Sequence, residues 1–164
     1  MKRLDPIDPG KALGILNKVS FFNAFSSEEK EVLTGFHSHF FVAKPSTRII
    51  AQGGQDQSFY IILSGQVAVH HTASPEPLAE LFPGDFFGEI SFLTDRKRTT
   101  SVDAKVTTIL FEIDKATLKH MTSPIREKLK DNIIKVLVER LDHMNQRVIE
   151  LSTPQRTKTG NKVN

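Results

Sequence analysis

Three residues with anion-binding chemistry stand close together in the middle of the chain: Gly88, Glu89 and Arg98. Gly88 lets the backbone approach a ligand without a side chain in the way. A short helix that begins there points the N–H groups of residues 89–91 outward, and the N-terminus of a helix favours a phosphate. Arg98 returns on a facing strand, where its fork of N–H groups can hold phosphate oxygens. The spacing therefore predicts a phosphate-binding site.

The acid in this segment needs a reason of its own, because a carboxylate beside a phosphate site repels the anion. Glu89 has such a reason if its carboxylate accepts a hydrogen bond from a sugar hydroxyl. A phosphate and a ribose held in one place indicate a nucleotide.

The spacing of apolar residues along the sequence predicts the strands that must position this site. Short β-branched or aromatic runs are separated by turn residues, and they span 39–42, 48–51, 59–63, 66–71, 78–82, 99–104 and 108–113. Many short strands at near-regular spacing predict an antiparallel sandwich or barrel. The runs on either side of Ser64-Gly65 predict a tight hairpin, and residues 87–93 predict one or two helical turns.

Helices are predicted on both sides of the strands. Residues 10–35 predict short helices, the second of which begins at a serine cap at Ser26 with acids in its first turn. A long helical pattern follows Pro124, a suitable first-turn proline. Its apolar stripe consists of Ile134, Leu137, Leu141, Met144, Val148 and Leu151. This stripe either packs on the protein's own strands or joins two subunits as a helix pair.

Composition narrows the class of protein. The 164 residues suit one globular domain. The net charge of +3 is supplied by Arg156, Lys158 and Lys162 near the C-terminus, so the rest of the chain is neutral. A nucleic-acid binder usually carries a basic face on its folded part, and we therefore expect no direct DNA binding. No apolar run reaches membrane length and no secretory leader is present, which predicts a cytoplasmic protein without a membrane span.

Catalytic and metal chemistry find little support. The absence of cysteine excludes disulfides and cysteine-ligated metals. His37-Ser38-His39 places two imidazoles on one strand face, but a metal site needs three or four ligands. The adjacent His70 and His71 point to opposite faces of a strand. Since the sequence also contains no serine–histidine–acid set, Walker loop or kinase signature, we expect no enzyme, no cofactor and no metal.

The segment from Gly84 to Leu93, followed by Arg98 to Val102, resembles the phosphate-binding cassette of the cyclic nucleotide-binding domain family. That family includes the bacterial catabolite activator protein and the regulatory subunits of cyclic-AMP-dependent protein kinase. The likeness covers residues from about 15 to 150. It implies a mainly β fold: a double-stranded β-helix, or jelly-roll-like β-roll, with N-terminal helices and a long C-terminal helix.

The resemblance also implies domain boundaries. We expect an N-terminal extension over residues 1–9 and the cyclic nucleotide-binding domain over 10–151, with C-terminal helices over 114–151. Residues 152–164 form a polar, basic tail whose composition predicts disorder.

Carried over by position, the resemblance assigns roles to individual residues. Glu89 would accept the ribose 2′-hydroxyl, and Arg98 would pair with the cyclic phosphate. Backbone amides would complete the phosphate shell, and apolar side chains would form a wall beneath sugar and base. The amides belong to residues near Gly88, Ile90, Ser91 and Thr99, and the wall consists of Val69, Leu78 and Leu81.

The purine stays open between cyclic AMP and cyclic GMP. The arginine is followed by Thr99-Thr100 where the family commonly has a small residue. A hydroxyl at Thr99 resembles members that favour cyclic GMP, and it is equally compatible with cyclic AMP. On the lid helix, Met144 and Asn145 match the positions that touch the base, and Asn145 could read either purine. Family frequency favours cyclic AMP.

One departure from the family pattern lies before the strand that begins at Phe59. The family usually has an acid ahead of the glycine after its second strand, whereas this chain reads Gln52-Gly53-Gly54-Gln55 with Asp56 close by. We interpret that position as turn chemistry.

The function expected is a cyclic-nucleotide sensor that acts through ligand-induced movement of its C-terminal helices. Its partners would be the cyclic nucleotide and an unidentified effector protein, and the helical stripe would allow a homodimer. The alternatives are a nucleotide-free interaction or scaffold protein of the same fold, and the sensor fragment of a DNA-binding regulator.

Overall fold

The computed structural model describes residues 1–4, 7–36 and 39–152. The predictions for His37, Ser38 and the tail from residue 153 onward lie outside the described residues. The chain divides into two compact units, residues 1–128 and 129–164, and each is described by itself.

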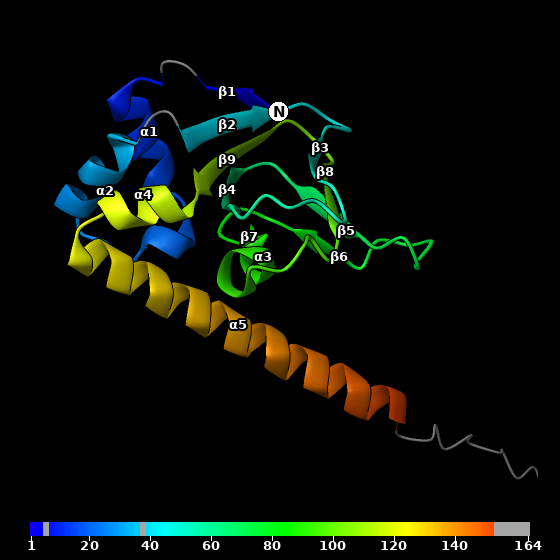
Figure 1. Ribbon diagram of the computed structural model, residues 1–164. Helices are drawn as coiled ribbons and strands as arrows, with labels where there is room; N and C mark the ends of the chain where they lie inside the picture. The colour runs from blue at the N-terminus through cyan, green and yellow to red at the C-terminus, as the bar shows by residue number, and fades with distance from the viewer. Residues whose placement is uncertain (5–6, 37–38, 153–164) are drawn as a thin grey trace, which may run out of the picture. The chain divides into compact units, whose positions relative to one another are not determined.

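The first unit is built on two antiparallel sheets (Figure 1). One sheet has the strand order β1-β2-β9-β4-β7, with β1 Lys2–Arg3, β2 Phe40–Ala43, β9 Thr108–Ile113, β4 Phe59–Ser64 and β7 Phe86–Phe87. The other has the order β3-β8-β5-β6, with β3 Arg48–Ile50, β8 Ser101–Ala104, β5 Val67–His70 and β6 Ala79–Leu81. The expected β-roll is confirmed, and each predicted run overlaps a strand; β1 and β7, of two residues each, were not predicted.

Side chains from both sheets meet in one hydrophobic cluster. Its buried members are Ile50, Tyr60, Ile62, Val67, Phe87, Val102 and Leu110. They come from three strands of each sheet, because alternation along a strand directs every second side chain to the same face. The two sheets therefore face each other across this core.

The tight hairpin predicted across Ser64-Gly65 is wrong. β4 pairs with β7 and β9, whereas β5 pairs with β6 and β8, so the two runs belong to different sheets. The chain crosses between the sheets at Gly65, which has a φ of +94°. A Cβ at this position would lie 2.5 Å from Thr108 Oγ1, so the crossing requires glycine.

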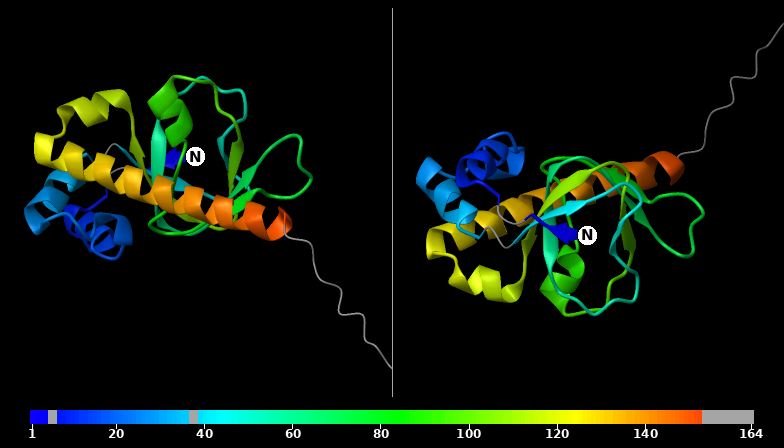
Figure 2. Two further views of the ribbon diagram at one scale, coloured as in Figure 1. Left: turned by 90° about the horizontal axis from the view of Figure 1, so that it is seen from below. Right: turned by 90° about the horizontal axis from the view of Figure 1, so that it is seen from above.

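The helices of the first unit gather at one end of the roll in the views of Figures 1 and 2. They are α1 Pro9–Leu16, the short 3₁₀ helix η1 Ser20–Phe22, α2 Ser27–Thr34 and α4 Lys115–His120. The predicted serine cap is confirmed: Ser26 Oγ accepts the Glu29 N–H at 3.2 Å, and the Glu29 carboxylate accepts the Ser26 N–H at 2.8 Å. The ring of Phe21 lies 6.0 Å from that of Phe86, which joins these helices to the roll.

The long C-terminal helix, α5, spans Ser123–Ser152 and confirms the helical pattern after Pro124. Its first residues belong to the first unit, where Lys128 Nζ donates to Glu29 Oε2 at 2.6 Å. The remainder of the helix forms the described part of the second unit. There the stripe residues Ile134, Leu141, Met144, Val148 and Leu151 are all more than half exposed. Among the described residues, none of the helices is long and apolar enough to cross a membrane.

Candidate functional site

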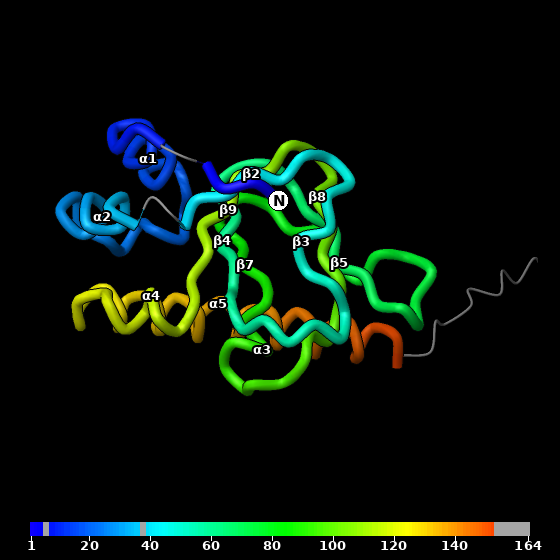
Figure 3. Tube along the Cα trace, turned by 45° about the horizontal axis from the view of Figure 1, so that its top comes forward, coloured from blue at the N-terminus to red at the C-terminus, as the bar shows by residue number. Residues whose placement is uncertain are grey.

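The predicted phosphate-binding segment forms a connection between the two sheets, from β7 through α3 (Glu89–Thr94) to β8 (Figure 3). Gly88 is the N-cap of α3 and has a φ of +86°, in the left-handed region. A Cβ at Gly88 would lie 2.7 Å from Arg98 Nη1 and 3.0 Å from Ile50 Cδ1. The close approach expected of this glycine is therefore an approach to the arginine of the same segment.

Arg98 is held from both its backbone and its side chain. Its N–H donates to Gly54 O at 2.8 Å, and its carbonyl accepts the Gly53 N–H at 2.8 Å. The guanidinium donates from Nη1 to Gly88 O at 2.8 Å and from Nε to Asp56 Oδ2 at 3.1 Å. These contacts bring Gly88 and Arg98 together, as the spacing predicts.

Asp56 is the residue of this site that the sequence interpretation missed. Its carboxylate forms an ion pair with Arg98, in which the arginine side chain is 2% exposed and the aspartate side chain 53% exposed. A buried guanidinium is costly without a counter-charge, and Asp56 supplies one from the solvent side. The signal in the sequence was an acid two positions after the Gly53-Gly54 turn, which we interpreted as turn chemistry.

The other residues of the cassette differ in their exposure. Glu89 and Ser91 are buried, Thr100 is half-buried, and Ile90 and Thr99 are exposed. The structure thus places the carboxylate of Glu89 in the interior, one residue from the left-handed glycine.

Helix α3 is anchored to the roll from its inner face. The ring of Phe92 lies 4.8 Å from that of Phe59 on β4, in an edge-to-face contact. The N–H groups in the first turn of a helix have no partner within the helix, so the chain in this place offers main-chain donors next to the Arg98 guanidinium.

The predicted apolar wall is only partly assembled. Val69 and Leu81 pack against the core cluster. Leu78 is 52% exposed, although its N–H donates to Val69 O at 2.8 Å. Asn145 lies in the second unit, so its predicted role at the base stays a prediction.

A buried tyrosine, Tyr60, lies near the Arg98–Asp56 pair. The Tyr60 ring stacks on Phe87 at 5.4 Å, and its hydroxyl donates to Glu112 Oε1 at 3.1 Å. Burial and the negative charge of Glu112 raise the pKa of Tyr60 well above its usual range. Tyr60 is therefore neutral and acts as a hydrogen-bond donor, not as an acid or base.

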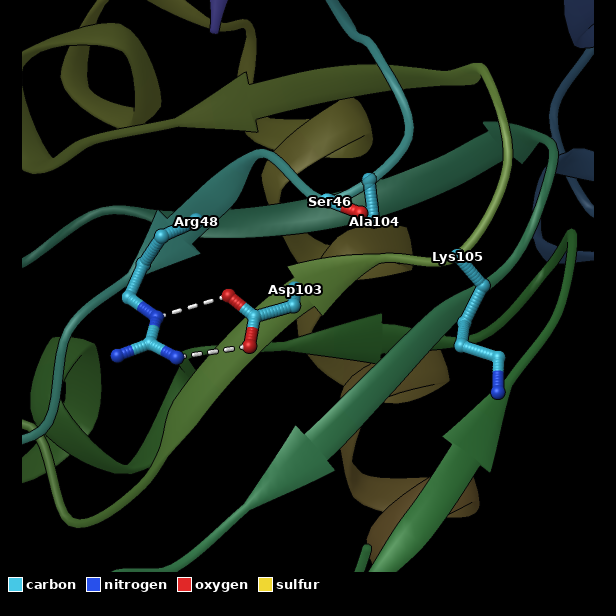
Figure 4. A pocket seen from close by; sticks show the side chains of 5 residues that line it. All are labelled: Ser46, Arg48, Asp103, Ala104 and Lys105. Atoms are coloured by element: carbon cyan, nitrogen blue, oxygen red, sulfur yellow. Dashed lines mark hydrogen bonds and ion pairs between the residues drawn. The ribbon is translucent and has the colours of Figure 1, made fainter.

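A second arginine–aspartate pair lies elsewhere on the roll. An open hollow of about 620 Å³ is lined by Ser46, Arg48, Asp103, Ala104 and Lys105 (Figure 4). Arg48 donates to the two Asp103 oxygens at 2.8 and 2.9 Å, and these bonds hold the pKa of Asp103 below its usual value. None of the residues predicted to bind a ligand lines this hollow.

Residues 41–123 match the family described as cyclic nucleotide-binding domain. The cAMP-dependent protein kinase regulatory subunit of Yarrowia lipolytica is 29% identical over 119 residues, which make up 73% of this chain and 32% of that protein. The corresponding subunit of Dictyostelium discoideum is 35% identical over 91 residues, or 52% of this chain and 28% of that protein. The chain thus spans about a third or less of these curated relatives.

Solved structures have the same fold. A cyclic nucleotide-binding domain from Methylobacillus flagellatus superposes with a TM-score of 0.70 at 20% identity, over 90% of this chain and 86% of that one. The catabolite activator protein of Thermus thermophilus superposes with a TM-score of 0.66 at 25% identity, over 80% of this chain and 62% of that one. The fold and the matched residues define the class of β-roll domains to which these structures belong. This chain belongs to the cyclic nucleotide-binding domain family.

Proposed function

We propose that the chain is a cyclic-nucleotide sensor whose ligand, cyclic AMP or cyclic GMP, binds at Gly88, Glu89 and Arg98. The observation that carries this proposal is the buried guanidinium of Arg98, which touches the carbonyl of a left-handed glycine at the start of α3. Burial strengthens the attraction of this positive charge for an anion, because a charge removed from water is screened less. A singly charged cyclic phosphate suits such a site.

Phosphate binding would be an exchange of anions. Asp56 occupies the Nε edge of Arg98 with a half-exposed carboxylate. The incoming phosphate would take over N–H groups from that carboxylate, which is easily returned to water because it already faces solvent. Glu89 would accept the ribose hydroxyl from the interior side. Ser91 and Thr99 would add main-chain donors to the phosphate.

The signal would leave the cassette through contacts at the end of α3. Asp95, the C-cap of α3, forms an ion pair with Lys115 at the start of α4. A shift of α3 on binding would therefore pull on α4, and so on the segment that leads into α5. An effector protein would read this movement.

The rival function is an interaction protein of the same fold that binds no nucleotide. The observation that favours it is the same Arg98–Asp56 pair, since the arginine already has an anion. A regulatory subunit of a cAMP-independent protein kinase A from Trypanosoma brucei has a similar fold, with a TM-score of 0.60 at 22% identity. Fold alone therefore does not decide between the two.

Isothermal titration calorimetry with cyclic AMP and cyclic GMP decides it. The sensor binds at least one of them with a measurable heat. No heat with either nucleotide at near-millimolar concentration would exclude the sensor function and favour the interaction protein.

A further inference from the structure

An apolar row crosses the second sheet beside the cassette. Ile50 on β3 and Val69 on β5 both pair with Val102 on the strand between them. Ile50 also reaches the cassette, because its Cδ1 lies 3.0 Å from the position of a Cβ at Gly88.

Two polar residues, Gln52 and His71, come next along the chain after Ile50 and Val69. Gln52 stands two residues after Ile50, and His71 stands two residues after Val69, so each lies just beyond the end of its strand. Both are half-buried, and their Nε2 atoms lie 3.3 Å apart. The Gln52 N–H donates to Ser101 Oγ at 3.0 Å, so the pair is fixed to the chain just after Arg98.

Two backbone donors determine which atoms of this pair face each other. The Thr72 N–H donates to Gln52 Oε1 at 3.0 Å, and this directs the amide nitrogen toward the imidazole. The Ala73 N–H donates to His71 Nδ1 at 3.0 Å, and this places the proton of a neutral imidazole on Nε2. The two facing nitrogens are therefore both donors.

Two donors cannot bond to each other, so the N–H of each nitrogen is available to an acceptor that lies beside the pair. A half-buried donor without an acceptor costs free energy. Gln52 adjoins the cassette along the chain, because the next residue, Gly53, donates its N–H to the Arg98 carbonyl at 2.8 Å. An acceptor that belonged to a ligand held at the cassette would satisfy both.

We propose that Gln52 and His71 read the purine of the bound cyclic nucleotide and select a 6-keto purine; this rests on the proposed function. Guanine presents two neighbouring acceptors, N7 and O6, on one edge, whereas adenine presents N7 beside a 6-amino donor. The two donors of the protein can both bond to the guanine edge. On the adenine edge, one of them would face the 6-amino group, which is itself a donor. The pair thus selects cyclic GMP over cyclic AMP, against the preference expected from family frequency.

Three nucleotides test this on the wild-type protein. Cyclic IMP shares N7 and O6 with cyclic GMP but lacks the 2-amino group that Thr99 could read. Calorimetry should give similar affinities for cyclic GMP and cyclic IMP, both about tenfold or more tighter than cyclic AMP, since one matched pair of hydrogen bonds discriminates by about this factor.

Two variants and a matched control locate the effect. His71→Ala should weaken cyclic IMP and cyclic GMP about tenfold and change cyclic AMP by less than about threefold. Gln52→Glu keeps an oxygen that accepts the Thr72 N–H and replaces the amide donor by a carboxylate oxygen. The preference for cyclic IMP over cyclic AMP should therefore decrease or reverse. The control is His70→Ala, because the imidazole of His70 lies 3.8 Å from Asp103, and this variant should leave every ratio of affinities unchanged.

The outcomes separate the two proposals. Binding of cyclic AMP as tight as cyclic IMP overturns the reading of the 6-keto group while the sensor function stands. A preference for cyclic GMP that cyclic IMP does not share assigns selection to the 2-amino group and also overturns it. If the ratio of cyclic IMP to cyclic AMP affinity is equal in the wild type and in His71→Ala, the reading of the 6-keto group is also overturned. No binding of any of the three nucleotides overturns the sensor function and this inference with it.

Discussion

Replacing Arg98 by alanine should abolish tight binding of the cyclic nucleotide. In the free protein the guanidinium bonds to the carbonyl of Gly88 and pairs with Asp56. The phosphate would take at least two charge-assisted hydrogen bonds from it.

The magnitude follows from this exchange of partners. Hydrogen bonds to charged groups contribute about 1.5–3 kcal/mol each, so two of them give about 3–6 kcal/mol. The Asp56 pair that is given up is half exposed on one side, and ion pairs of this kind contribute about 0–1 kcal/mol. The difference is at least about 2 kcal/mol, which corresponds to an affinity about thirtyfold or more weaker at 1.4 kcal/mol per tenfold.

Calorimetry on the wild type, Arg98→Ala and Arg48→Ala measures this loss. Arg48 is the matched control, because it also pairs with an aspartate but lines the separate hollow. Circular dichroism establishes that both variants are folded. If Arg98→Ala binds within threefold of the wild type, the phosphate sits elsewhere and the reasoning fails.

Asp56→Asn should tighten binding about fivefold, because it removes a competing charge worth about 1 kcal/mol near solvent; a weaker Kd would mean that Asp56 positions the arginine for phosphate. A hydrogen bond from Lys128, with further ones from Ser26, lowers the pKa of Glu29 below 4.5. The stability that Glu29 contributes is therefore present above about pH 4.5 and lost as the pH falls through the lowered value. In urea unfolding, the free energy of unfolding of Glu29→Gln should decrease less on acidification than that of the wild type. If the exposed stripe on α5 joins two subunits, ultracentrifugation should detect a dimer that Leu141→Glu dissociates; a wild-type monomer at high concentration refutes that reading.

Local patterns in the sequence predicted most of the elements and the core of the cassette. Alternating apolar residues indicate strands because a half-buried strand has a period of two. The glycine at position 88 was predicted to let the backbone approach a ligand, which stays a prediction; its φ of +86° and its close approach to Arg98 explain why a glycine stands there. The serine cap at Ser26 depends on residues within one helical turn, so it was also readable.

Contacts between distant segments were not readable in the same way. Asp56 lies 42 positions before Arg98, and only the pairing of the Gly53-Gly54 turn with the arginine backbone brings them together. The hairpin at Ser64-Gly65 failed for a related reason: a turn between two strands does not reveal whether they share a sheet. Similarly, the resemblance to the family assigned Leu78 by position to an apolar wall, yet more than half of it is exposed.

The internal counter-ion of Arg98 has a consequence for how such a protein reports concentration. A domain that depended on its ligand to neutralise a buried cation would unfold when empty, as many metal-dependent folds do. Here the chain carries its own counter-ion, Asp56. If the proposed function holds, binding of the nucleotide would shift an equilibrium between two folded forms, so occupancy would follow the supply of the nucleotide without cycles of unfolding.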